Sequence, residues 1–254
     1  TSDPASNQWE DKGFVLCSRA DKQKNWTRSS TNDWSAYFRY NAIDPTYIIT
    51  PKGEHWLIYG SWHSGFAAVQ LDPETGKTLK EMPPFYTTQA ELNKVTKRVY
   101  TRDANCRWQG AEAPDTIYNP ETDYYYLFMA YDGLDVPYNT RVARSATIDG
   151  TYTGDVVLTH PYQFSNSTGW VGISHCAVFN DGQGNYYYAS QQRFPTTAGG
   201  NAPNAVMLGG VRSIQWQSNG WPVVMPERYA AVPQVAITAS EIAGTWEHID
   251  LSYS

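Results

Sequence analysis

An internal repeat constrains the fold of this chain more than any other feature of its sequence. Three times, a polar residue is followed by a short apolar strand, a tight turn and a second strand rich in aromatic residues. The three units open at Asp44, Glu112 and His175. Repeats of roughly 65 residues, with about four strands each, are typical of the blades of a β-propeller.

The repeat also predicts where these three polar residues lie. The innermost strand of each blade starts near the propeller axis, so residues that open these strands converge there. One aspartate at such a place is better explained as a turn cap or as the partner of an arginine. Three chemically active side chains at equivalent places in three repeats instead favour a shared functional site.

The composition agrees with an all-β globular protein and excludes several classes. With 254 residues, 15% aromatic and 17% charged, the chain is not disordered and can bury a large core. Its most apolar stretch, Tyr124–Tyr131, is far shorter than the ~20 residues of a membrane helix. The net charge of −6 and scattered basic residues argue against a nucleic-acid partner. We therefore predict a protein that binds neither membrane nor nucleic acid.

Two further residue types leave alternatives open. The 19 Tyr and 10 Trp against 8 Phe suit either an ordinary β-rich protein or a carbohydrate site, where amphipathic rings stack on sugars. Cys17, Cys106 and Cys176 lie far apart, which excludes a disulfide scaffold or a zinc site but permits one bridge or free thiols. Ala90–Val99 is the only segment for which we expect a short helical turn.

Five segments carry a family resemblance, through their order and spacing: Tyr40–Pro45, Tyr59–Trp62, Glu112–Pro114, Gly172–Val178 and Gly220–Val224. They resemble glycoside hydrolase family 43, and most of all its 1,5-α-L-arabinanases. The likeness runs from about Trp9 to about Tyr229. It implies a five-bladed β-propeller, secreted or periplasmic, that hydrolyses arabinose- or xylose-containing polysaccharides with inversion.

The resemblance assigns chemical roles to three residues. Inversion needs a general acid on the leaving oxygen and a base that activates water on the opposite face. Glu112 matches the general acid, and Asp44 matches the carboxylate that raises the pKa of this acid and orients it. His175 matches a histidine that helps hold a calcium ion, mostly through water. From the residues alone, an axial histidine bonded to Glu112 or Asp44 is the alternative.

Substrate-binding residues follow from the same motifs. Asn41 is expected to bind a sugar hydroxyl, and Trp62 and His63 stand where the relatives carry aromatic residues that stack on arabinose. For Trp62, core packing between blades is an equal alternative. Ser61 belongs to the same segment, and Trp108 is expected at the rim of the cleft.

The chain departs from the family pattern at both ends. Five blades of ~65 residues need more than about 300 residues, and the His-Asp-Pro motif that contains the family's general base is absent. We expect residues 1–236 to form the larger C-terminal part of the propeller, from late in the second blade to the fifth. An N-terminal fragment of the same protein then completes it and supplies the base; an inactive truncation is the alternative. Residues 237–254 are expected to form a linker and the first strand of a C-terminal β-barrel.

These observations predict a glycosidase that cleaves α-1,5-linked L-arabinan or arabino-oligosaccharides. Another family 43 activity, arabinofuranosidase or β-xylosidase, is the first alternative. The second is a carbohydrate-binding propeller without catalysis, which the missing base favours. Retention of Asp44 and Glu112 argues against it, because burying a carboxylate pair is costly. Ser190–Arg193 replaces a segment in which many relatives have a histidine, which leaves endo or exo action open.

Overall fold

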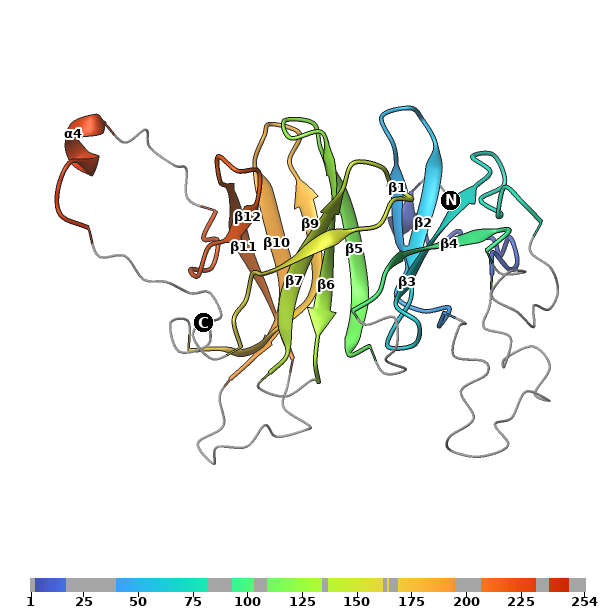
Figure 1. Cartoon of the computed structure of the whole chain (residues 1–254), viewed down its shortest axis with the longest axis horizontal. Helices are drawn as coiled ribbons and strands as arrows, with labels where there is room; N and C mark the ends of the chain where they lie inside the picture. Colours follow the sequence, from blue (N-terminus) through green and yellow to red (C-terminus); the bar gives the residue numbers. More distant parts are fainter. Residues whose placement is uncertain are drawn as a thin grey trace.

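Three β-sheets stand side by side in this protein (Figure 1). The computed structural model describes residues 3–16, 40–81, 93–102, 109–133, 137–161, 164, 169–194, 207–231 and 238–246. Outside the sheets lie the 3-10 helix η1 (Pro4–Ser6) and the helix α4 (Ala239–Ile242). Among the described helices, none is long and apolar enough to cross a bilayer.

Each sheet has four strands that neighbour one another in chain order, and all neighbouring pairs are antiparallel. The first sheet contains β1 (Thr46–Ile49), β2 (His55–Tyr59), β3 (Phe66–Leu71) and β4 (Thr96–Tyr100). The second contains β5 (Ala111–Asn119), β6 (Tyr124–Tyr131), β7 (Asn139–Ser145) and β8 (Thr153–Val157). The third contains β9 (Val171–Asn180), β10 (Tyr186–Arg193), β11 (Leu208–Trp216) and β12 (Pro222–Val224). The predicted all-β fold is confirmed, and each predicted repeat is the first hairpin of a four-stranded sheet.

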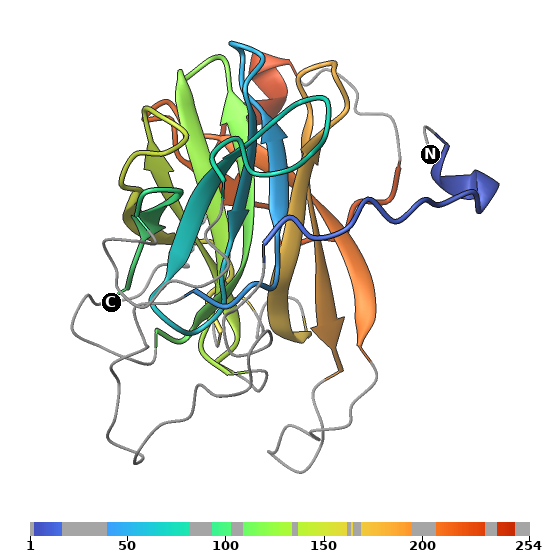
Figure 2. The ribbon, with the colours of Figure 1, turned by 90° about the vertical axis from the view of Figure 1, so that its right-hand side faces the viewer.

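The second sheet lies between the other two, as its burial shows. Every residue of β6 after Tyr124 is buried, so both faces of this strand are covered. In β1, buried and exposed residues alternate, and the second half of β9 shows the same alternation. Alternation indicates that these two strands have one packed face and one open face, whereas β3 of the first sheet is buried on both faces. Figure 2 shows the molecule turned by 90° about the vertical axis of Figure 1, and in this view the strands of the three sheets run in similar directions.

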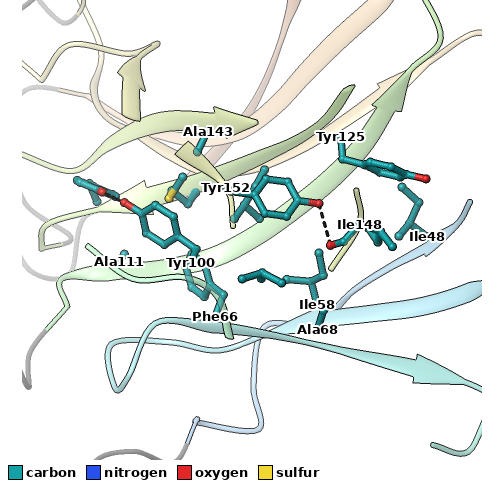
Figure 3. Close-up of a cluster of buried hydrophobic side chains, with 14 residues drawn as sticks. Ile48, Ile58, Phe66, Ala68, Tyr100, Ala111, Tyr125, Ala143, Ile148 and Tyr152 are labelled. Carbon is teal, nitrogen blue, oxygen red and sulfur yellow. Dashed lines mark hydrogen bonds between the residues drawn. The ribbon is translucent and has the colours of Figure 1, made fainter. Parts of the chain in front are cut away.

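Two hydrophobic clusters join the sheets. In the first, Ile58 and Phe66 of the first sheet pack with Tyr125 of the second and with Tyr152 (Figure 3). The Tyr152 hydroxyl donates a hydrogen bond to the Ile148 carbonyl at 3.2 Å, so the buried phenol is satisfied. The second cluster joins the second sheet to the third and contains Phe128, Val142, Tyr188 and Ile214. These clusters fix the three sheets relative to one another.

Two local predictions differ from the structure. The helical turn expected over Ala90–Val99 is wrong in its second half, because Thr96–Val99 belong to β4 and pair with β3. The β-branched side chains of Thr96 and Val99 are buried there and favour a strand. Of residues 237–254, expected as a linker and a first strand, the described residues 238–246 contain the short helix α4, which was not expected and whose Thr238 and Glu241 form a capping box.

Candidate active site

The first strands of the second and third sheets share an irregularity. Between Glu112 and Asp115, β5 contains one residue more than the facing stretch of β6. Between Ser174 and Ala177, β9 exceeds β10 in the same way. Such β-bulges re-aim side chains and are common next to active sites.

The chain before β1 bulges at the equivalent place. The Gly60 amide donates to the Ile43 carbonyl at 3.1 Å, while Thr46 faces Ile58. One residue at each of the three bulges has a left-handed backbone: Asp44 (φ 52°), Ala113 (φ 50°) and His175 (φ 50°). This backbone costs about 1–2 kcal/mol for a residue other than glycine, and such strain clusters at functional sites. The prediction that Glu112 itself is the equivalent residue is therefore off by one position, because Ala113, which like Asp44 precedes a proline, is the residue in register with Asp44 and His175.

Both carboxylate oxygens of Glu112 accept a hydrogen bond. The Trp62 indole Nε1–H donates to Oε2 at 2.9 Å, and the Tyr138 hydroxyl donates to Oε1 at 2.5 Å. Trp62 comes from the loop after β2, and Tyr138 directly precedes β7. The half-buried carboxylate is thus fixed from two sides by groups on different sheets.

Tyr138 also connects Glu112 to His175. Its hydroxyl lies 3.2 Å from His175 Nδ1, and its side chain is 1% exposed. Burial and the hydrogen bond to Glu112 raise the pKa of Tyr138 well above its usual value, so the phenol keeps its proton at any physiological pH. Nothing in the repeat or in the motifs pointed to Tyr138, which lies ahead of a third strand that no motif covers.

Asp44 approaches the same place from the first sheet. Its Oδ2 accepts a hydrogen bond from the Ala113 amide at 3.1 Å, at the bulge residue next to Glu112. Its charge also contributes to the raised pKa of Tyr138. Asp44, Glu112 and His175 are therefore brought together from three sheets, with Trp62 and Tyr138 between them.

This arrangement can be compared with known proteins. A family model described as Glycosyl hydrolases family 43 matches residues 2–222. The chain belongs to glycosyl hydrolase family 43. It is 28% identical to the extracellular endo-α-(1→5)-L-arabinanase 2 of Bacillus subtilis, over 98% of this chain and 54% of that protein. It is 27% identical to an extracellular endo-α-(1→5)-L-arabinanase of Thermotoga petrophila, over 83% of this chain and 46% of that protein.

Solved structures give the same result. The family 43 protein YxiA of Bacillus licheniformis superimposes with a TM-score of 0.66 at 27% identity, covering 83% of this chain and 49% of that one. The endo-1,5-α-L-arabinanase of Thermotoga petrophila gives a TM-score of 0.64 at 26% identity, covering 84% and 48%. The resemblance to family 43 and its arabinanases is confirmed. The chain spans about half the length of these relatives.

The family's Gly-Ser-Trp segment is a tight loop in this chain. Its Trp62 amide donates to the Ala111 carbonyl at 2.8 Å, and the Trp62 carbonyl accepts from Gln109 at 2.8 Å. Gly60 is required there, because a Cβ would lie 2.4 Å from the Gly65 carbonyl oxygen. The loop thus holds Trp62 against the start of β5, where its indole reaches Glu112. Two roles were predicted for Trp62, stacking on a sugar and core packing between blades. The hydrogen bond from Trp62 to Glu112 belongs to neither of them.

Other predicted substrate-binding residues build the same loop. Asn41 Nδ2 donates to the Ser61 carbonyl at 2.6 Å, which the His63 amide also approaches at 2.6 Å. Ser61 is buried and His63 is half-buried. One amide hydrogen of Asn41 is therefore used inside the protein. Trp108 lies outside the described residues.

Asp115 is a half-buried residue that the sequence reasoning missed, although it directly follows the Glu-Ala-Pro motif of the family. Its Oδ1 accepts from the Thr46 hydroxyl at 2.9 Å, and its Oδ2 accepts from the Val178 amide at 2.5 Å. It therefore ties all three sheets together beside the site. Burial raises the pKa of Asp115, although these hydrogen bonds oppose the shift.

The described residues do not by themselves fit a directly coordinated calcium ion. His175 is exposed, and no cluster of three His, Cys, Asp or Glu side chains suited to a metal occurs in the described part of the chain. Calcium prefers six to eight oxygen ligands, whereas His175 offers one imidazole. Its neighbour Cys176 is a buried free thiol, and Cys17 and Cys106 lie outside the described residues.

Proposed function

We propose that this chain provides the acid half of an inverting family 43 site that cleaves α-1,5-linked L-arabinan. The observation that carries the proposal is the fixed carboxylate of Glu112, held by Trp62 and Tyr138 and flanked by Asp44 and His175. The arabinanases among the relatives support the substrate class. In this role Glu112 protonates the leaving glycosidic oxygen, and Asp44 is the carboxylate that tunes and orients it.

The hydrogen bonds let Glu112 keep its position when it gives up its proton. An indole N–H only donates, so Oε2 accepts from Trp62, and Oε1 accepts from the Tyr138 hydroxyl. Each carboxyl oxygen has a second lone pair, so the proton given to the leaving oxygen sits on a lone pair that neither Trp62 nor Tyr138 occupies. Tyr138, whose hydroxyl lies 3.2 Å from His175 Nδ1, thus holds Glu112 in place.

The general base comes from outside this chain in our proposal. We assign it to an aspartate of an N-terminal segment of the same protein, which completes a five-bladed propeller. Open apolar surface on both outer sheets supports this partner. Tyr47 and Ile49 of β1 are 52% and 53% exposed, and Phe179 of β9 is 47% exposed. Faces of this kind are unfavourable in water and mark a contact surface.

A depression also borders the third sheet, and it suits an inserted partner. A depression of about 540 Å³ is lined by aromatic and acidic side chains, among them Tyr187, Trp216, Tyr229, Asp181 and Glu227. A packed blade would fill such a depression with its own side chains.

Three further parts of the proposal rest on the family. A calcium ion near His175 would take most of its oxygen ligands from water and would supply a fixed positive charge beside the site. Residues 237–254 lead into a C-terminal β-barrel. The relatives are named extracellular, which supports action outside the cell or in the periplasm.

Release of reducing sugar from linear 1,5-α-arabinan tests the activity, with the chain alone and with the N-terminal segment added. Glu112→Gln should lower the rate by ~10²–10⁴-fold, as loss of a general acid does. Glu121→Gln, in the exposed turn before β6, is the matched control and should be unchanged. Activity that survives Glu112→Gln would exclude this role. Arabinan binding without release would identify a carbohydrate-binding propeller, and preferential cleavage of xylosides would identify a β-xylosidase.

A further inference from the structure

A buried arginine with unused hydrogen-bond donors lies between the second and third sheets. Arg212 of β11 and Gln192 of β10 are both 0% exposed. Arg212 is paired across the strands with Tyr188, and Ser190 and Gln192 follow Tyr188 at every second position, so all four share one face of the sheet. This face packs on the second sheet, because the Tyr188 hydroxyl is bonded to the Thr140 hydroxyl of β7 at 2.7 Å.

Most polar atoms of this group lack a protein partner. Arg212 Nε donates to the Pro226 carbonyl at 3.3 Å. Across the described residues, nothing accepts from Arg212 Nη1 or Nη2, and neither amide atom of Gln192 is bonded. The Ser190 hydroxyl interacts with the Tyr188 side chain but makes no hydrogen bond of good geometry. A buried polar atom without a partner is destabilising, and more so when it is charged, so several such atoms in one place indicate a ligand.

The surroundings of Arg212 contain no compensating negative charge. The titratable groups acting on it are Tyr188, which is negative only when ionised, and the cationic Arg228; no carboxylate in the described part of the chain is among them. Burial lowers the pKa of Arg212, but a guanidinium remains protonated in proteins. A buried and unpaired charge is strongly destabilising, so Arg212 calls for an anion.

The lack of a side chain at Gly210 lets the two long side chains converge. A Cβ at Gly210 would lie 2.5 Å from Gln192 Oε1 and 3.1 Å from Arg212 Nη1. The backbone of Gly210 is outside the left-handed region, so its conformation does not require glycine. Glycine is required at this position because any larger residue would take the space that the Gln192 and Arg212 side chains occupy.

We propose that Arg212, Gln192 and Ser190 bind a small inorganic anion, of the size of chloride, between the second and third sheets. Arg212 Nη1 and Nη2, the Gln192 amide and the Ser190 hydroxyl donate to it. A sugar acid or a nucleotide cannot be the ligand, because the binding side chains are buried. Since β10 pairs with β9 beside His175, through Gln191 and Ser174, the anion stabilises the strand that brings His175 to the active site. This inference does not depend on the proposed activity.

Thermal unfolding in chloride tests the site. The chain is transferred to sodium gluconate and titrated with sodium chloride at constant ionic strength. At a chloride concentration of about ten times the dissociation constant, the Tm should have risen by about 3 °C on a saturating curve.

Arg212→Gln should abolish this rise, whereas Arg228→Gln, at an exposed arginine, should keep it. Gly210→Ala should raise the half-saturating chloride concentration at least about tenfold, because its Cβ displaces Gln192 and Arg212. A rise that is absent, or that persists in Arg212→Gln, overturns the proposal.

Crystals grown in bromide give a second test that requires no variant. The expected result is an anomalous peak within about 3.5 Å of Arg212 Nη1 or Nη2. Density for water alone at this place would overturn the proposal. A bromide peak without any chloride-dependent Tm would show binding at crystal concentration only, and would overturn it as well.

Discussion

The middle sheet and the two outer sheets have the same strand order but differ in how much of their surface is covered. In the middle sheet both faces are packed, as the buried β6 shows. In the outer sheets, β1 and the second half of β9 expose aromatic and aliphatic side chains on one face, although β3 of the first sheet is buried on both faces. The site draws on all three sheets: Glu112 and Tyr138 come from the middle one, and Asp44 and His175 come from the outer ones. Glu112 thus lies on a sheet that is packed on both faces, whereas Asp44 and His175 come from sheets that have exposed apolar side chains.

A pair of phenylalanines tests this comparison with the largest expected effect. Phe128 of β6 is 0% exposed and Phe179 of β9 is 47% exposed. Phe128→Ala should lower the free energy of unfolding by about 3–5 kcal/mol, because it leaves a cavity in a packed core. Phe179→Ala should lower it by less than about 1 kcal/mol in this chain, since little buried contact is lost. Urea unfolding measures both values. Similar losses for the two variants would show that the outer face is not open.

The same pair sharpens the proposal of an N-terminal partner. With that segment added, Phe179→Ala should weaken association measurably, whereas a substitution at the exposed Phe14 should not. Titration calorimetry of the two parts would decide this. Equal affinity for the parent and Phe179→Ala would remove the third sheet from the interface.

Tyr138→Phe has the next largest expected effect and concerns the connection between sheets at the site. The variant removes the hydroxyl that bonds Glu112 Oε1 and approaches His175 Nδ1. A hydrogen bond to a charged group contributes about 1.5–3 kcal/mol, so kcat should fall about 10- to 100-fold while KM changes little. Tyr118→Phe, which removes a hydroxyl bonded to Asp123 at the surface, is the control. A Tyr138→Phe variant that changes KM but retains kcat would contradict the positioning role.

Asp115 gives the smallest effect and tests how tightly the sheets are joined. Burial raises the pKa of Asp115 in the folded state above its ordinary value of 3.8. The folded state therefore holds the proton more strongly than the unfolded state, so this group's contribution to stability is fully present below pH 3.8 and is lost as pH rises through the higher folded pKa. Asp115→Asn should remove this downward slope of the unfolding free energy above about pH 4. An unchanged slope in urea unfolding at several pH values would exclude Asp115 as its source.

The sequence predicted the sheets better than the details of the site, and the reasons are physical. Alternating side chains and turn residues are local signals, so the first hairpin of each sheet was recognisable. Glu112 was aligned with Asp44 because both carry a carboxylate, although the proline that follows both Asp44 and Ala113 marks these two as the equivalent residues. Tyr138 was missed because its partners are distant in the chain. The capping box of α4, Thr238 with Glu241, was present in the sequence, but the segment was interpreted as a linker and a strand.

The left-handed backbone at Asp44, Ala113 and His175 limits which amino acids can replace these residues. Side chains branched at Cβ collide with their own backbone in this conformation, so valine, isoleucine and threonine are disfavoured whatever chemistry the site requires. Asparagine, aspartate, histidine and glycine tolerate it best. A library randomised at His175 and selected only for folding should therefore be enriched in these four residues. Geometry thus restricts this position to a small set before selection for catalysis begins, and that set contains the residue types that carry protons and bind metals.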